Sequence, residues 1–201
     1  MGSIAELSKV SYWEKRYSEK QTQWYLSEAH DSLVKYMPLL ASENSVKKFF
    51  LPLCGKSKDI PYLLSLGHRV FGIEGALQPI LELEKENSLK LNFDKERSIY
   101  FTDDHQLEIY FGDIFACPIE QYGPFDCIWD RASFVALDYS TRPAYVEVMR
   151  RSVLRGDGSY HDFKYLFQAY NYDKSLYPGP PTSVDWKDME QCFGDWADIK
   201  E

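Results

Sequence analysis

The sequence predicts an α/β fold in which a mostly parallel sheet carries helices on both faces. Predicted strands and helices alternate along most of the 201 residues, which is the pattern of such a sheet. Residues 49–74 read as a strand, a tight loop, a helix and a second strand, the βαβ unit of parallel sheets. The second strand ends on Glu74, about 20 residues after the loop glycine Gly55, and this spacing is typical of a nucleotide-binding crossover.

The elements of this unit follow from local sequence. We expect a buried strand at 49–51, a helix that ends at Leu66 and a strand at 69–73. Ser57 or Asp59 can cap the helix, and Gly67 is well placed to end it.

The loop of the unit favours one kind of ligand. It holds a single glycine, Gly55, whereas the G-x-G-x-x-G turn that binds pyrophosphate holds several. A carboxylate at the position of Glu74 can accept both hydroxyls of a ribose. A ligand with a ribose and no phosphate, such as S-adenosylmethionine (SAM), therefore suits the loop better, and a nicotinamide-dependent oxidoreductase is disfavoured. The spacing alone leaves open an ordinary crossover with a solvated Glu74.

The rest of the chain supplies further elements. A helix around Trp13 and Tyr17 and an amphipathic helix at 28–40 precede the unit. After Glu74 we expect a helix at 77–87, a hairpin of strands 98–101 and 107–111, a strand at 125–129, a helix at 142–154, a strand at 163–169, a helix at 184–193 capped by Ser183, and the start of a strand at 196–199. The polar residues 88–97 are assigned no element.

Four strand ends that carry polar residues or glycine form a candidate site, because ligands of parallel sheets bind at the carboxyl ends of the strands. These residues are Leu53 with Gly55, Glu74, Asp113 with Ile114, and Asp130 with Arg131. Trp13 and Tyr17 lie four residues apart on one helix face, where they could fasten the helix to the body or roof a cleft.

Composition and charge narrow the function. The length fits one domain spanning residues 1–201, which we expect to be a monomer. The net charge of −8 argues against a nucleic-acid partner or an anionic membrane surface. The four cysteines form no C-x-x-C pair and no histidine lies at ligand spacing, so no metal site is expected. The absence of a signal peptide and of a long apolar span predicts a cytoplasmic protein.

Several motifs together resemble the thiopurine S-methyltransferase family. They are S-Y-W-E-K-R-Y at 11–17, PLCGK at 52–56, GH-x-V-x-G-x-E at 67–74, GDIF at 112–115, FD-x-IWDRA-x-x-VAL at 125–137 and YD-x(5)-GPP at 172–181. The resemblance extends over residues 11–194. It implies a Rossmann-like class I methyltransferase that uses SAM, releases S-adenosylhomocysteine, and methylates the sulfur of an aromatic or heterocyclic thiol.

The resemblance also implies residue roles on the cofactor side. Leu53 would line the methionine part of SAM, and Glu74 would bind the ribose hydroxyls. Asp113 and Ile114 would meet the adenine, Ile114 through its backbone N–H.

Aromatic and basic residues complete the set. Trp13 and Tyr17 would cover SAM within an N-terminal cap of residues 1–25, although Tyr17 stands where the family often has tryptophan. Trp24 would border the methyl acceptor. Arg131 would lie at the mouth of the site, in reach of both cofactor and acceptor, and an ion pair with Asp130 or Glu74 is the structural alternative for it.

Other features depart from the family. Thr182 follows the GPP motif where an aromatic residue is usual, and residues 155–163 are more polar than expected before a strand. The family continues beyond the strand expected near Trp196, so we expect C-terminal strands to be missing. Their loss should expose a sheet edge and impair acceptor binding.

The expected reaction is an in-line displacement that needs no strong general base, so no catalytic residue is assigned. The partner is a small-molecule thiol. Two alternatives remain: a SAM-binding protein without turnover, and a methyltransferase of the same frame that acts on small thiols or halide.

Overall fold

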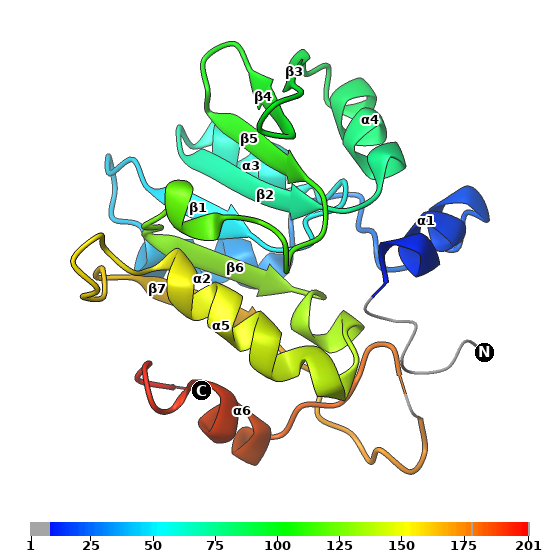
Figure 1. Cartoon of the computed structure of the whole chain (residues 1–201), viewed down its shortest axis with the longest axis vertical. Coiled ribbons are helices and arrows are strands. Elements are labelled where there is room, and N and C mark those ends of the chain that lie inside the picture. The colour runs from blue at the N-terminus through cyan, green and yellow to red at the C-terminus, as the bar shows by residue number, and fades with distance from the viewer. Residues whose placement is uncertain (1–8, 178, 201) are drawn as a thin grey trace.

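The computed structural model describes residues 9–177 and 179–200, which form a seven-stranded sheet between layers of helices (Figure 1). The strand order is β3-β4-β5-β2-β1-β6-β7. Strands β5, β2, β1, β6 and β7 run parallel, and β3, β4 and β5 pair antiparallel. Their bounds are Lys48–Leu51 (β1), Arg69–Glu74 (β2), Leu91–Asp94 (β3), Ile99–Thr102 (β4), Leu107–Phe111 (β5), Cys127–Arg131 (β6) and Lys164–Gln168 (β7). The predicted mostly parallel α/β fold is confirmed.

Helices cover both faces of the sheet. Their bounds are Val10–Ser18 (α1), Asp31–Leu40 (α2), Asp59–Ser65 (α3), Leu77–Glu86 (α4), Arg142–Ser152 (α5) and Trp186–Phe193 (α6). Side chains alternate across a strand, so Phe49 packs with the apolar faces of α2, α3 and α4. Its neighbour Phe50 packs with α5 and α6 on the opposite face. Figure 1 shows α5 in front of the sheet and α2 and α3 behind it.

The βαβ unit has the expected form. Strand β1 pairs in parallel with β2, and α3 connects them. Gly67 follows α3 with a φ of +82°, a conformation that glycine adopts without steric cost. The predicted cap is wrong: α3 begins at Asp59, its N-cap position is Lys58, and no side chain in the described part of the chain caps it, although the Oγ of Ser57 accepts the backbone N–H of Asp59 at 3.2 Å.

The hairpin of β4 and β5 is also confirmed, and β3 extends it. Sequence inspection assigned no element to residues 88–97, but Leu91–Asp94 pairs with Ile99–Thr102. Phe93 stacks on Tyr100 with ring centroids 4.5 Å apart. This short strand was missed because only two of its four side chains are apolar, and cross-strand pairing compensates for its weak pattern.

The C-terminal prediction needs two corrections. The expected strand at 196–199 is wrong for the described residues: the N–H groups of Trp196 and Ala197 both donate to Phe193 O, which continues the end of α6. Trp196 packs on Phe163 with a centroid distance of 5.6 Å, so its apolar character reflects a core contact.

The start of α6 also differs from the prediction. The helix begins at Trp186, and Asp185 is its cap. The buried Ser183, which was expected to cap the helix, instead bonds the backbone of Tyr172.

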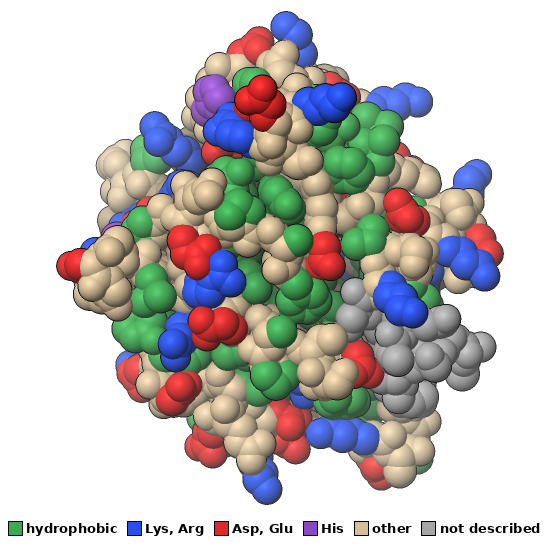
Figure 2. Space-filling model, viewed as in Figure 1, with side chains coloured by type: hydrophobic (Ala, Val, Ile, Leu, Met, Phe, Trp, Pro, Cys, Tyr) green, Lys and Arg blue, Asp and Glu red, His purple; other side chains and the backbone are tan. Residues whose placement is uncertain are grey.

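Strand β7 lies at the edge of the sheet. Among the described residues no helix is long and apolar enough to cross a membrane. Acidic and basic side chains are interspersed on the face that carries α5 (Figure 2), where Arg151 pairs with Glu120.

Candidate active site

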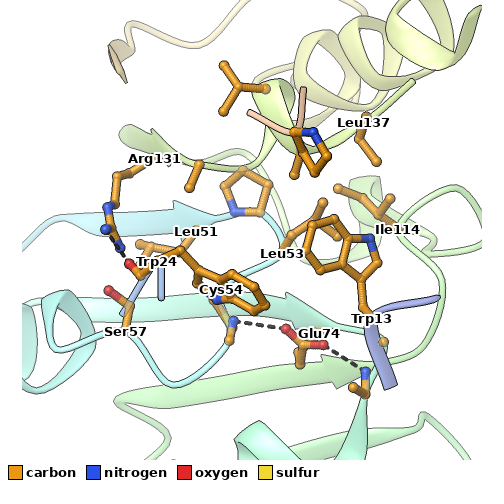
Figure 3. Close-up of a pocket in the computed structure, with 18 of the residues that line it drawn as sticks. Trp13, Trp24, Leu51, Leu53, Cys54, Ser57, Glu74, Ile114, Arg131 and Leu137 are labelled. Carbon is orange, nitrogen blue, oxygen red and sulfur yellow. Dashed lines mark hydrogen bonds between the residues drawn. The ribbon is translucent and has the colours of Figure 1, made fainter. Parts of the chain in front are cut away.

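A cavity of about 540 Å³ opens at the carboxyl ends of β1, β2, β5 and β6. Its volume is within the range of about 300–1,000 Å³ that is usual for small-ligand sites. All eight residues predicted for the site line it: Trp13, Tyr17, Trp24, Leu53, Glu74, Asp113, Ile114 and Arg131. Figure 3 labels all of them except Tyr17 and Asp113, and the labelled side chains surround one hollow.

The loop after β1 forms the floor of the cavity. Leu53 and Gly55 both have positive φ angles, +45° and +53°. Leu53 carries a steric cost that glycine avoids, and such backbone strain is common at binding sites. A Cβ at position 55 would lie 2.5 Å from the Tyr25 hydroxyl oxygen, so only glycine fits there without displacing Tyr25.

Glu74 joins this loop to the end of β2. One carboxylate oxygen accepts the N–H of Gly55 at 2.9 Å, and the other accepts the N–H of Ala76 at 2.7 Å (Figure 3). Burial raises the pKa of Glu74 to about 7, although the backbone N–H groups act in the opposite direction. Each carboxylate oxygen has a second lone-pair site, so Glu74 can still accept two hydroxyl groups. The alternative that the spacing left open, an ordinary crossover with a solvated Glu74, is wrong, because this side chain is only 6% exposed.

Helix α1 covers the floor. Val10 lies against Gly75, where a Cβ would come within 2.7 Å of a Val10 methyl. Trp13 and Tyr17 face the cavity, and both rings meet the ring of Trp24 edge-on at 5.5 and 5.8 Å. These two residues therefore pack α1 against the segment that holds Trp24, and they also line the cleft.

Hydrogen bonds tie this aromatic cluster to the floor. The hydroxyl groups of Tyr17 and Tyr25 are 2.6 Å apart, and the oxygen of Tyr25 accepts the backbone N–H of Lys56 at 3.0 Å. Burial raises the pKa of both tyrosines above their ordinary value, so they stay neutral near pH 7.

Asp113 and Ile114 follow β5. Phe111 pairs with Glu74 in the sheet, and the N–H of Gly112 donates to Glu74 O at 3.0 Å, which brings this segment next to the end of β2. Ile114 is buried. Asp113 is exposed, and one of its oxygens accepts the N–H of Phe115 at 2.9 Å.

Arg131 is the last residue of β6, and its side chain reaches the N-terminal segment of residues 10–25 that covers the cavity. Its Nη2 donates to the carbonyl oxygen of Trp24 at 2.6 Å (Figure 3). Its buried Nε has no hydrogen-bond partner in the described part of the chain. The guanidinium is therefore anchored at one nitrogen and keeps donors for a further partner.

The structural alternative for Arg131, an ion pair with Asp130 or Glu74, is wrong. Asp130 instead accepts the hydroxyls of Tyr145 and Tyr165, each at 2.8 Å. Glu74 is bonded to the backbone of the floor, as described above.

Sequence inspection missed several residues of the cavity. Asp59 was considered only as a cap, yet its buried carboxylate accepts the N–H of His30, the hydroxyl of Ser57 and the indole N–H of Trp129. Other missed lining residues include Arg16, Tyr25, Tyr170, Tyr177, Pro180 and Pro181. Their spacing carries no signal, because they come together only through contacts between distant segments.

Thr182 does not line the cavity. Its hydroxyl donates to Val135 O at 2.9 Å and accepts Nη2 of Arg142 at 3.1 Å. Pro180 and Pro181 line the cavity and Thr182 does not, so the departure from the family pattern at position 182 changes no lining residue.

The donor and acceptor set fits SAM. A carboxylate with spare acceptor sites suits ribose hydroxyls, the buried Ile114 offers an apolar surface, and aromatic rings offer faces to a cationic sulfur. No phosphate-binding glycine turn is present in the loop at 52–57.

Solved structures place the fold in one class. A TehB-like SAM-dependent methyltransferase from Corynebacterium glutamicum is similar with a TM-score of 0.55 and 13% identity, covering 92% of this chain and 81% of that one. TehB from Haemophilus influenzae gives a TM-score of 0.56 and 17% identity, covering 91% and 55%. The chain therefore has the Rossmann-like fold of class I SAM-dependent methyltransferases.

Comparison with known sequences identifies the family of the chain within this fold class. The family model of thiopurine S-methyltransferase matches residues 8–201, so the chain belongs to this family. A probable thiopurine S-methyltransferase of Danio rerio is 30% identical over 94% of this chain and 82% of its own length. The thiopurine S-methyltransferase of Pseudomonas putida (strain GB-1) is 28% identical over 92% and 83%, and that of Bos taurus is 26% identical over 94% and 76%. The predicted family is confirmed, and the chain is a SAM-dependent methyltransferase.

Proposed function

We propose that this protein transfers the methyl group of SAM to the sulfur of a small aromatic or heterocyclic thiol. The observation that carries the proposal is Arg131, whose buried Nε lacks a partner in the described residues while its Nη2 holds the Trp24 carbonyl. An anionic sulfur is a natural partner for this guanidinium. The rings of Trp24, Tyr170 and Tyr177 line the same cavity and offer flat apolar surfaces to an aromatic acceptor.

We also propose how the cofactor is held. Glu74 binds the ribose hydroxyls with its remaining acceptor sites, and Leu53 contacts the methionine part. Asp113 and the backbone N–H of Ile114 bind the adenine. Trp13 and Tyr17 cover the bound cofactor. The shared cavity, the buried carboxylate and the family membership support these roles.

The residues of the chain act by orientation and by exclusion of water. Bound SAM supplies an electrophilic methyl group on a positively charged sulfur. The acceptor thiol loses its proton to solvent and enters as the thiolate, which Arg131 orients toward the methyl carbon. As the new carbon–sulfur bond forms, the old one breaks, so the charges of thiolate and sulfonium both disappear. The aromatic rings of the cover exclude water from this exchange, and no side chain is needed as a general base.

The test joins binding and turnover on one sample. We expect SAM to bind in calorimetry and a thiopurine to be methylated, and Arg131→Gln to lower kcat/KM for the thiol roughly tenfold to a hundredfold, the range of one hydrogen bond to a charged group. Arg97→Gln is the matched control, because Arg97 lies in the turn between β3 and β4 and pairs with Asp94.

Each contrary outcome has a distinct meaning. Binding of SAM without methylation of any thiol would favour a SAM-binding protein without turnover. Methylation of small thiols or halide in preference to aromatic thiols would overturn the acceptor class. Unchanged turnover by Arg131→Gln would contradict the role given to this arginine, and tighter binding of NADH than of SAM would contradict the cofactor assignment.

A further inference from the structure

The cover of the cavity carries a second arginine, Arg16, that the proposed reaction does not use. It lies on α1 next to Tyr17, and its side chain lines the cavity together with Trp13 and Tyr17. The guanidinium carbon is 5.1 Å from the ring centroid of Trp24. It is thus held against the ring that we assign to the methyl acceptor.

Most donors of Arg16 are still available. Nη1 donates to the Tyr12 hydroxyl at 3.1 Å, and Nε donates to Gln21 O at 3.3 Å. A guanidinium has five N–H donors, so three have no partner among the described residues. Among the residues that the structure describes, Arg97, Arg142 and Arg151 each lie within 4.0 Å of a carboxylate, whereas Arg16 does not.

Charge divides the cavity into two parts. The buried acids are Glu74 in the floor and Asp59 beside it, and both accept hydrogen bonds from donors of the protein. The basic groups Arg16 and Arg131 belong to the cover and to the end of β6, where they contact opposite ends of Trp24: its ring and its carbonyl oxygen. This local positive charge stands out in a protein with a net charge of −8.

A thiolate brings one negative charge, which Arg131 can meet, and leaves Arg16 without an anionic partner. We propose that Arg16 is a specificity-determining residue that selects acceptors with a second anionic group, such as a carboxylate on the aromatic ring. The flat guanidinium binds a carboxylate through two parallel N–H donors, while the ring of the acceptor packs near Trp24. This proposal rests on the proposed thiol methylation and specifies its substrate class.

The experiment compares acceptors that differ only in this charge. The 2-, 3- and 4-mercaptobenzoates are each paired with the corresponding mercaptobenzamide, a neutral group of the same size. The measured quantity is the ratio of kcat/KM for the acid to kcat/KM for the amide. For the wild-type protein we expect a ratio above one for at least one isomer, and Arg16→Gln should lower that ratio roughly tenfold.

Two further variants make the result specific. Arg16→Lys keeps the charge and should recover part of the ratio, while it loses the two-pronged geometry. Arg97→Gln removes an arginine in the turn between β3 and β4, at the edge of the sheet, and should leave the ratio unchanged. Equal losses for acid and amide in Arg16→Gln would mean that Arg16 only supports the ring of Trp24, and would overturn the proposal.

The acid and amide acceptors test the charge selection by Arg16 separately from thiol methylation. Methylation of the amides with no preference for the acids by the wild-type protein would overturn the charge selection and leave thiol methylation intact. Methylation of neither acids nor amides would overturn thiol methylation itself, and the selectivity with it.

Discussion

The floor of the cavity and its cover are built from different interactions. The floor, meaning the loop at 52–57 together with Glu74, is fixed by short hydrogen bonds from backbone N–H groups to one buried carboxylate. The cover, meaning residues 10–25, is held by aromatic contacts and by single hydrogen bonds to distant segments, such as that from Lys56 N to the Tyr25 hydroxyl. The floor can therefore keep its shape alone, whereas the cover depends on the floor for its position.

One residue connects the two regions. Asp59 begins α3 beside the floor, and it accepts the N–H of His30 at 2.7 Å where the chain leaves the cover for α2. It also accepts the indole N–H of Trp129 at 2.8 Å from β6. A buried carboxylate with donors from three segments fixes their relative positions, because each lost donor would leave a buried charge less well satisfied.

The largest expected effect comes from breaking the floor. In Glu74→Gln the amide N–H₂ must face the N–H of Gly55 or of Ala76, so one acceptor becomes a donor and the loop loses a hydrogen bond. The variant also loses one acceptor for the ribose. We expect the Kd for SAM, measured by calorimetry, to rise roughly a hundredfold or more, as for two hydrogen bonds to a charged group.

The control for this variant is Glu96→Gln, the same chemical change in the exposed turn between β3 and β4. It should bind SAM as the wild-type protein does. A folded Glu74→Gln protein with an unchanged Kd would show that the floor does not hold the ribose.

A smaller effect is expected from unseating the cover. In Gly75→Ala the new methyl group would lie 2.7 Å from a Val10 methyl, so α1 must shift. Overpacking of this kind costs about 1–3 kcal/mol, which corresponds to a rise of at least roughly fivefold and at most roughly 150-fold in the Kd for SAM if the cover contributes to binding. Gly156→Ala is the neutral control, because a Cβ there meets no atom within 4 Å.

Gly75 also adjoins Glu74, so a double variant must separate the two regions. Val10→Ala removes the methyl groups that the side chain added at position 75 would touch. The pair Val10→Ala with Gly75→Ala should therefore recover most of the lost affinity. Failure of this rescue would place the damage in the floor instead of the cover.

The two regions also differ in how far the sequence predicted them. The floor was predicted from residues alone, because Gly55 and Glu74 lie in one βαβ unit whose geometry is local. The spacing could not show that Glu74 points inward to bond two N–H groups, since a solvated carboxylate has the same sequence.

The cover was placed on the site only through family resemblance. Trp13 and Tyr17 also read as residues that fasten a helix, and Trp24 carried no signal of its own, because contacts such as that of Arg131 with the Trp24 carbonyl span 107 positions. Arg16 gave no signal, since an arginine on an amphipathic helix is ordinary until its neighbours are known. The missed strand β3 and the misread strand at 196–199 have the same origin: pairing and packing between segments decided both.

The mildest test of the comparison is pH, which changes the charge of Glu74 in the floor and leaves the buried tyrosines of the cover uncharged. Burial raises the pKa of Glu74 to about 7, while burial also raises the pKa values of Tyr17, Tyr25 and Cys54, so those groups stay protonated and uncharged between pH 6 and 8. SAM binding favours the carboxylate, so binding at pH 6 must release a proton from Glu74. Affinity should then fall by about tenfold from pH 8 to pH 6, following the ionised fraction of a group with this pKa.

Folding responds with the opposite sign. The folded protein holds a proton on Glu74 between the ordinary pKa of 4.5 and the raised value of about 7, so this group destabilises the fold as pH rises through that window.

Calorimetry at pH 6 in buffers of different ionisation enthalpy should report nearly one proton released per SAM bound, and at pH 8 close to none. A proton count near zero at both pH values would mean that the protonation of Glu74 does not change when SAM binds, and would contradict the expected release.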